Sequence, residues 1–354
     1  MNRKRATVGA LVLIASAALW WSRPSDSSAA PPSRAVSSTR APPAAQPART
    51  VAPKADAKRG VARRAAAGPV YAASWGSGAD QLGRERPDEG NPLGPMSFTT
   101  DAKGRLLVLD GVNGRLVRRG ADGSPDTLID IDVINPEDIA VGEDGSIAVL
   151  DRFRDKSVAL FDESGRPLGK LPLEGDGVPD VGSITSITVD GGDVYAEREH
   201  GPLVKLGSLS GQPAADRTEI PGRPSRDGLS FLNAGIIEAP AGRAYVSSVE
   251  RATGNHRYTR ELRLEAPLRQ IHLLDTDQAG TVYFGAELER SETETSLIVV
   301  CLEALSGMPM GSVAVPANTL AEESFRDFVV LPGGGVLHAL RTEQGVSYTR
   351  YDCE

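Results

Sequence analysis

A gapless internal repeat is the feature that most constrains the fold of this 354-residue chain. Residues 94–110 align with residues 135–151 at an offset of 41 residues. Each copy has a short apolar segment, a turn that contains glycine and a second apolar segment that ends in Leu-Asp. A third apolar segment follows at 115–118 and again at 157–161. Alternating short strands and turns at this spacing are typical of an antiparallel blade.

Weaker copies of the strand-turn-strand pattern follow around residues 187–196, 239–246, 277–284 and 331–338. One four-stranded sheet that is apolar on both faces cannot bury either face alone, whereas a closed ring of such sheets buries all of them. The sequence therefore predicts an all-β, six-bladed β-propeller. The six predicted turn glycines, spaced near the length of one blade, are Gly104, Gly145, Gly192, Gly242, Gly280 and Gly335.

The two ends of the predicted propeller domain, residues 69–354, complete each other. The last segment, 345–351, corresponds to the third strand of blade six, so this blade lacks its outer strand. Residues 70–75 precede blade one and alternate in a way that suits a strand. We therefore predict that this N-terminal strand completes the last blade and closes the ring.

Residues 1–21 have the pattern of an export signal, with basic residues at positions 3–5 and an almost uncharged run over 6–21. Two fates are compatible with this run. Small residues at 15–17 suit signal-peptide cleavage, while Trp20 and Trp21 suit the membrane interface of an uncleaved anchor. Either fate predicts a periplasmic or extracellular domain, which residues 6–21 would anchor to the inner membrane if they are retained.

Residues 22–68 predict a disordered linker rich in Pro, Ala and Arg, because they contain almost no large apolar side chain. Of the 39 Lys/Arg and 47 Asp/Glu of the chain, 12 and 2 lie in residues 1–68, which leaves 27 and 45 in the predicted propeller. The propeller therefore has a formal net charge of −18. Because such a domain repels phosphate backbones, nucleic acid is excluded as a partner of the propeller.

Blade one resembles an NHL repeat. The resemblance rests on 75–78 (Trp-Gly-Ser-Gly), 91–95 (Asn-Pro-Leu-Gly-Pro), the Asp101 to Gly104 turn and the Leu107–Arg115 segment with Asp110 and Asn113. It is partial over blade two and fades after residue 181. This resemblance implies a six-bladed ring with a binding face, but no particular chemistry.

Polar residues recur where each innermost strand is predicted to begin, near the mouth of the central channel. Such a set is compatible with ligand binding, with metal binding or acid–base chemistry, or with simple exposure to water. We assign no catalytic residue, no metal ligand and no cofactor, although a divalent cation in the channel stays open. The candidate ligand-binding residues are Glu137, Thr185, His272 and Asp327, with Arg152, Arg269 and Arg326 beside them.

Gluconolactonase-like enzymes provide the catalytic alternative, since the chain also resembles them at Glu89-Gly90-Asn91-Pro92. That resemblance implies a hydrolase with a divalent ion in the channel. The other ligand positions of that family have no match here, and His200, His256, His272 and His338 show no metal-ligand spacing. Whether the chain is an enzyme is left open by its sequence.

Four polar residues predict turn structure rather than ligand contacts. Asp110 and Asp151 end the second strand of blades one and two, where an Asp side chain accepts main-chain N–H groups of the following turn. Asn113 and Arg115 lie in the same hairpin as Asp110.

The two cysteines of the chain, Cys301 and Cys353, are candidates for a disulfide in an oxidising compartment. Cys301 falls on a predicted strand of blade five and Cys353 is the penultimate residue. The sequence leaves open whether they lie close enough to bond.

These observations favour a non-catalytic exported β-propeller, a binding or scaffold module that presents one face to a protein or glycan in the bacterial cell envelope. The runner-up is the metal-dependent, gluconolactonase-like hydrolase.

Overall fold

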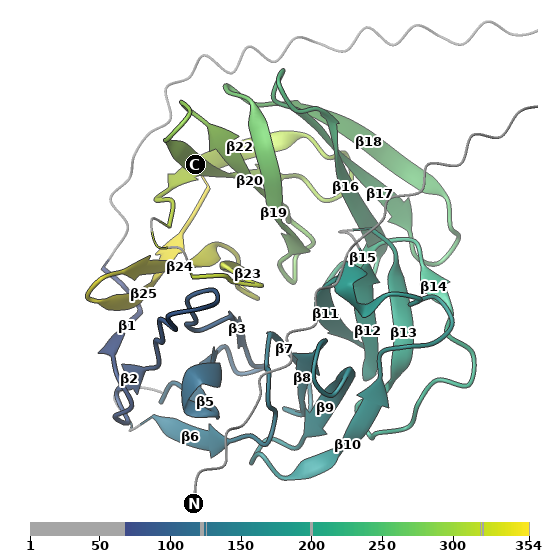
Figure 1. Ribbon diagram of the computed structural model, residues 1–354. Coiled ribbons are helices and arrows are strands. Elements are labelled where there is room, and N and C mark those ends of the chain that lie inside the picture. Colours follow the sequence, from purple (N-terminus) through teal and green to yellow (C-terminus); the bar gives the residue numbers. More distant parts are fainter. Residues whose placement is uncertain are drawn as a thin grey trace, which may run out of the picture. The chain divides into compact units, whose positions relative to one another are not determined.

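A computed structural model describes residues 68–353 except 121–123, 125, 199–200, 319 and 321. The predicted leader, 1–21, and all of the predicted linker but Gly68 lie outside the described residues. The described chain forms six sheets, antiparallel except for the β1–β2 pair, arranged around a common centre, which confirms the six-bladed β-propeller (Figure 1). No helix in this part of the chain has the length and apolar content of a membrane span.

Blades one to three each contain four strands in chain order from the centre outward. Short 3-10 helices, η1 (Gly111–Asn113) and η2 (Val181–Ser183), lie in their connections. The strands are β3 (Ser97–Thr100), β4 (Leu106–Asp110), β5 (Arg115–Arg118) and β6 (Thr127–Asp130); β7 (Asp138–Val141), β8 (Ile147–Asp151), β9 (Ser157–Phe161) and β10 (Pro167–Pro172); and β11 (Ile184–Asp190), β12 (Asp193–Arg198), β13 (Leu203–Ser208) and β14 (Glu219–Ile220).

Blades four and five repeat this order, and blade six takes its outer strands from the N-terminal end of the domain. Their strands are β15 (Arg223–Pro224), β16 (Ser230–Glu238), β17 (Arg243–Glu250) and β18 (His256–Arg263); β19 (Leu268–Thr276), β20 (Val282–Glu289), β21 (Thr295–Leu302) and β22 (Pro309–Val315); and β23 (Phe328–Val330), β24 (Val336–Thr342), β25 (Gly345–Tyr351), β1 (Tyr71–Trp75) and β2 (Gln81–Leu82).

Burial explains why these segments read as continuous apolar runs. Every residue of β4 and β8 is buried, because both faces of each blade pack against neighbouring blades. The outer strand β10, in contrast, is exposed along its length except at Leu171. Apolar area removed from water between the blades is therefore the main stabilising contribution to the ring.

One predicted turn glycine, Gly242, lies in another hairpin of its blade, and a second, Gly335, lies in the predicted turn but one residue past the glycine that closes it. In blade four the inner hairpin turns at Gly228, whose N–H donates to the carbonyl of Ser225, and Gly242 belongs to the next hairpin, between β16 and β17. In blade six Gly334, not Gly335, donates the corresponding bond, to Leu331. The error in blade four arose because β15 has only two residues, too few for an apolar pattern to reveal.

The N-terminal strand closes the ring as predicted. β1 pairs antiparallel with β25, from Tyr71 opposite Tyr348 to Ser74 opposite Gly345. The rings of Tyr71 and Tyr348 stack with centroids 5.8 Å apart, and Phe98 of blade one meets Tyr348 edge-on at 4.9 Å. The first and last strands of the domain therefore share one sheet and one core with blade one.

A disulfide joins Cys301 of β21 to Cys353, the residue that the sequence placed near the end of the last blade. The two Cα atoms are 6.2 Å apart, and Cys301 is buried. The bond links blade five to the segment that follows β25, so it fastens the strand on which ring closure depends.

Removal of the Tyr348 ring is expected to destabilise the whole ring. Tyr348→Ala should lower the free energy of unfolding by about 3–5 kcal/mol, because a large buried aromatic side chain is replaced by a cavity. Denaturant titration followed by tryptophan fluorescence measures this loss. Tyr348→Phe keeps the ring and should lose far less; equal losses in the two variants would contradict the closing role of the ring.

Removal of the disulfide is expected to cost about 2–4 kcal/mol, because the bond closes a loop of 52 residues. The double variant Cys301→Ala/Cys353→Ala should melt at a lower temperature than the wild type under oxidising conditions. A reductant should lower the melting temperature of the wild type toward that of the variant and leave the variant unchanged. A wild-type melting temperature that does not respond to complete reduction would speak against a stabilising bond.

Candidate functional site

The innermost strands begin at one end of the ring, and the channel mouth there is lined by ion pairs. Glu137, only 4% exposed, precedes β7. Arg152 binds it with two nitrogens, Nε to Oε2 at 3.0 Å and Nη2 to Oε1 at 2.9 Å. The Arg152 guanidinium also lies over the rings of Phe153 and Phe325, at 4.7 Å and 4.3 Å. This bidentate, ring-covered geometry fixes Glu137 and Arg152 to each other.

Arg326 spans the centre of the ring. From the start of blade six its Nη2 donates to Oδ2 of Asp138 in blade two, at 2.9 Å, and to the carbonyl of Ile187 in blade three, at 3.1 Å. Asp138 is fully buried and also accepts from the Ser97 hydroxyl at 2.6 Å. One guanidinium and one carboxylate thus connect four of the six innermost strands.

Asp327 lies one residue away from its predicted position in the repeat. With Gly334 as the turn glycine of blade six, Arg326 corresponds to Glu137, and Asp327 corresponds to Asp138. The Asp327 carboxylate binds Nη1 of the buried Arg341 at 2.7 Å and accepts from the Ser324 hydroxyl at 2.9 Å. Burial opposes its charge, but Arg341 outweighs this effect and lowers the pKa of Asp327.

The remaining candidates lie in blades three and five. Nε2 of His272 is 3.1 Å from Oε2 of Glu287, and Arg269 Nη1 is 3.6 Å from the other oxygen of the same carboxylate. Thr185 is half-buried at a bulge of β11, between Ile184 and Ser186. All seven candidates therefore lie in or beside the innermost strands, but each charged one is paired with a side chain of the ring, and Arg269 and His272 share Glu287.

Glu137, His272 and Asp327 each pair with a different side chain, Arg152, Glu287 and Arg341 respectively. Within the described residues no group of three His, Cys, Asp or Glu side chains has the arrangement of a metal site. The sequence missed the partners Asp138, Glu287 and Arg341, because their pairing depends on the register between strands and blades. Two further pairs were missed in the same way, Arg223 with Glu197 and Arg226 with Asp275.

Asp110, Asn113 and Arg115 fasten the segment that leads from β1 into blade one. Asp110 accepts from Gly83 N at 2.8 Å, from Asn113 at 2.8 Å and from Arg115 at 2.8 Å. Asn113 and Arg115 in turn donate to main-chain carbonyls of that segment, including Gly76 at 3.0 Å and Gly78 at 2.7 Å. These contacts hold the chain that closes the ring.

Asp151 supports two exposed apolar side chains on the rim of the channel mouth. Its carboxylate accepts from the main-chain N–H of Asn135 at 3.2 Å and of Arg154 at 2.9 Å. These bonds hold two neighbouring loops together. Ile134 on one loop is 64% exposed, and Phe153 on the other is 57% exposed. We call these two side chains the rim patch.

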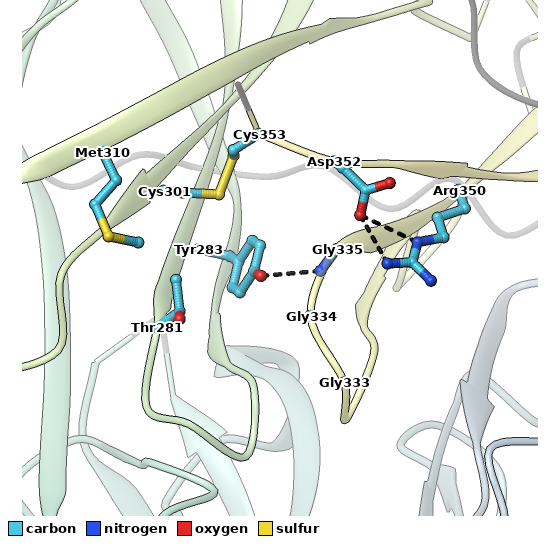
Figure 2. Close-up of a pocket in the computed structure, with 10 residues that line it drawn as sticks. All are labelled: Thr281, Tyr283, Cys301, Met310, Gly333, Gly334, Gly335, Arg350, Asp352 and Cys353. Carbon is cyan, nitrogen blue, oxygen red and sulfur yellow. Dashed lines mark hydrogen bonds and ion pairs between the residues drawn. A yellow bond between two sulfur atoms is a disulfide. The ribbon is translucent and has the colours of Figure 1, made fainter.

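Two cavities lie between blades rather than at the channel mouth. One, of about 260 Å³, is lined by Tyr283, the turn Gly333–Gly335 and the disulfide, as Figure 2 shows. Tyr283 Oη there accepts from Gly335 N at 2.9 Å (Figure 2). The other, of about 430 Å³, follows the edge of β1 beside Arg119 and Asp126 of blade one.

Comparisons with known proteins found similarity in the fold alone. No protein-family model matches the chain, and no curated protein matches its sequence. Among solved structures, hydrazine synthase of Kuenenia stuttgartiensis matches with 15% identity over 73% of this chain and 76% of that chain, at a TM-score of 0.46. Streptogramin B lyase matches with 12% identity over 75% of this chain and 96% of that chain, at a TM-score of 0.40. BamB from Moraxella catarrhalis matches with 11% identity over 73% of this chain and 86% of that chain, at a TM-score of 0.37. Sequence identities and TM-scores this low support no inference about function.

His338 of β24 is buried next to the Asp327–Arg341 pair. Its ring packs 4.8 Å from the Phe328 ring, and neither ring nitrogen has a hydrogen-bond partner among the described residues. Burial, together with Arg341 and His272, lowers the pKa of His338 to about 4 against the opposing effect of Asp327. The folded protein therefore holds this imidazole neutral at pH values where the unfolded chain protonates it.

Acid is expected to destabilise the fold through His338. As the pH falls from about 6.5 toward about 4, the unfolded state binds a proton that the folded state does not, which removes about 3 kcal/mol of stability. Below about pH 4 both states are protonated and this contribution stays constant. His338→Leu should lose less stability than the wild type between pH 7.5 and pH 4.5 in urea titrations. Parallel pH dependences would contradict the assignment.

Proposed function

We propose that this chain is an exported, non-catalytic β-propeller that binds a protein partner in the bacterial cell envelope through the channel-mouth end of the ring. The export-signal pattern of the sequence at residues 1–21 supports the placement. The Cys301–Cys353 disulfide supports it as well, because disulfides persist in oxidising compartments.

The proposal rests on a contrast at the channel mouth between carboxylates that are paired with arginines and apolar side chains that are exposed to solvent. The carboxylates there, Glu137, Asp138 and Asp327, are each bound by an arginine of the ring. A substrate or metal would have to break such a pair, which is costly where the partners are buried. The rim patch, Ile134 and Phe153, instead presents large apolar side chains to solvent. Exposed aromatic side chains on an ordered support are typical of protein-binding surfaces.

The charge of the propeller adds a preference about the partner. A net charge of −18 over residues 69–354 speeds encounter with a positively charged protein and opposes an acidic one. Arg152 and Arg154, on either side of Phe153 in the sequence, are local exceptions. The proposed partner therefore combines an apolar contact with a largely basic surface.

Photo-crosslinking tests this function in cells that express the full chain. A photoreactive phenylalanine analogue at position 153 should yield a discrete protein adduct. The same analogue at position 103, in the inner hairpin turn at the other end of blade one, should not, although Lys103 is itself exposed.

With the crosslinked partner purified, the double variant Ile134→Ser/Phe153→Ser should weaken binding about tenfold or more, because apolar anchors carry most of the affinity of an interface. Lys103→Ser is the matched control and should leave the dissociation constant unchanged. Adducts of equal yield from positions 153 and 103, or no adduct from 153, would refute this function for the rim patch.

A further inference from the structure

The outer edge of blade six is only half covered. β2 pairs in parallel with β1 over Ser74 and Trp75, so within the described residues no strand lies beside the part of β1 from Tyr71 to Ala73 on that side. The cavity of about 430 Å³ lies along this part of the edge. Its lining consists of Pro69, Val70, Tyr71, Ala72, Ala73, Ser74, Asp80, Arg119 and Asp126. We call this cavity the edge groove.

Hydrogen bonding shows which main-chain groups point into the edge groove. Gly76 N donates to Leu82 O at 2.9 Å, so Gly76 and, by the alternation of a strand, Ser74 direct their main-chain groups toward β2. Ala72 lies two residues before Ser74, so its main-chain groups have the same orientation. Its N–H and C=O therefore point into the groove, where the described chain supplies no strand to pair with them.

Two other outer strands, β10 and β18, are protected against added strands, whereas β1 is not. β10 begins and ends with proline and carries Lys170, and β18 carries Arg257, Arg260 and Arg263. Prolines and charged side chains on an edge prevent a further strand from pairing. β1 has instead only small side chains, Ala72, Ala73 and Ser74, between Tyr71 and Trp75.

The charge of the groove indicates what it accepts. Asp80 is exposed, and Asp126 is 2.7 Å from Arg119, so two carboxylates face one guanidinium. Burial and the carboxylates of Asp126, Asp110 and Asp80 raise the pKa of Tyr71 to about 12, and Arg119, which lies over its ring, only partly offsets them. With two carboxylates and one guanidinium in its lining, the groove has an excess of negative charge.

We propose that the edge groove binds an extended, positively charged segment of a partner protein, which pairs with Ala72 as an added strand and directs a Lys or Arg toward Asp80. Main-chain hydrogen bonds supply affinity in this mode of recognition, and the alternate side chains supply specificity. The groove lies at the outer edge of blade six, so it is a second surface, separate from the rim patch of the proposed function.

The test begins with selection of a random peptide library on the purified full-length chain. Enriched peptides, labelled with a fluorophore, are then measured by anisotropy against variants. Peptides that contain Lys or Arg within an extended, proline-free segment should predominate. Ala72→Pro removes the outward N–H that pairs with the peptide and should weaken binding about tenfold, while Ala72→Ser, which keeps the N–H, should not.

Two further measurements cover the case in which Ala72→Pro does not fold. Asp80→Lys should weaken the same peptides, and the loss should shrink at high salt because the interaction is screened. Two versions of the peptide are N-methylated on alternate main-chain nitrogens, one at the odd and one at the even positions. One of the two should no longer bind the wild type, because its methylated nitrogens cannot donate hydrogen bonds to the edge of β1. Circular dichroism and thermal melting establish that each variant is folded.

Several results would overturn the inference. These are a library without enriched peptides, enrichment of acidic peptides, or peptides that bind folded Ala72→Pro as tightly as the wild type. Peptides lost instead in Ile134→Ser/Phe153→Ser bind the rim patch, which would support the proposed function and refute the edge groove. Displacement of every peptide by a synthetic peptide of residues 22–68 would identify the chain's own linker as the occupant and likewise refute a partner.

Discussion

The pairing of β1 with β25 is the interaction on which the rest of this structure depends. A blade is apolar on both faces, so any gap in the ring would expose two such faces to water. Blade six has its inner strands at the C-terminal end of the chain and its outer strands at the N-terminal end of the domain. The stacked pair Tyr71 and Tyr348 then joins both ends to the core of blade one.

This closure also determines where the surfaces of the molecule lie. Because Asp110, Asn113 and Arg115 hold the segment after β1 against blade one, the part of the edge-groove lining that contains Asp80 is held in place. At the channel mouth, the pairing of Arg326 with Asp138 joins blades that are not neighbours. The charges in the channel thus contribute to the ring itself, and the apolar rim patch is left to face solvent.

Sequence reasoning succeeded where a pattern repeats locally. The 41-residue offset between Gly104 and Gly145 identified two blades, and the missing outer strand of blade six pointed to residues 70–75 as its complement. It failed in blade four, where β15 has two residues and Gly228 marks a turn that the apolar pattern hides. It placed Asp327 one residue out of register, and such a shift changes which way a strand residue points.

The sequence by itself determined the all-β class, the six blades, the closing strand and the acidity of the domain, because each follows from local spacing or from composition. The tertiary structure decided which side chains meet. Asp138 and Arg326 are 188 residues apart in the chain, and Cys301 and Cys353 are 52 apart. The exposed main chain of Ala72 likewise depends on where β2 stops. Contacts between blades depend on strand register and ring geometry, and neither is encoded in the period of a single blade.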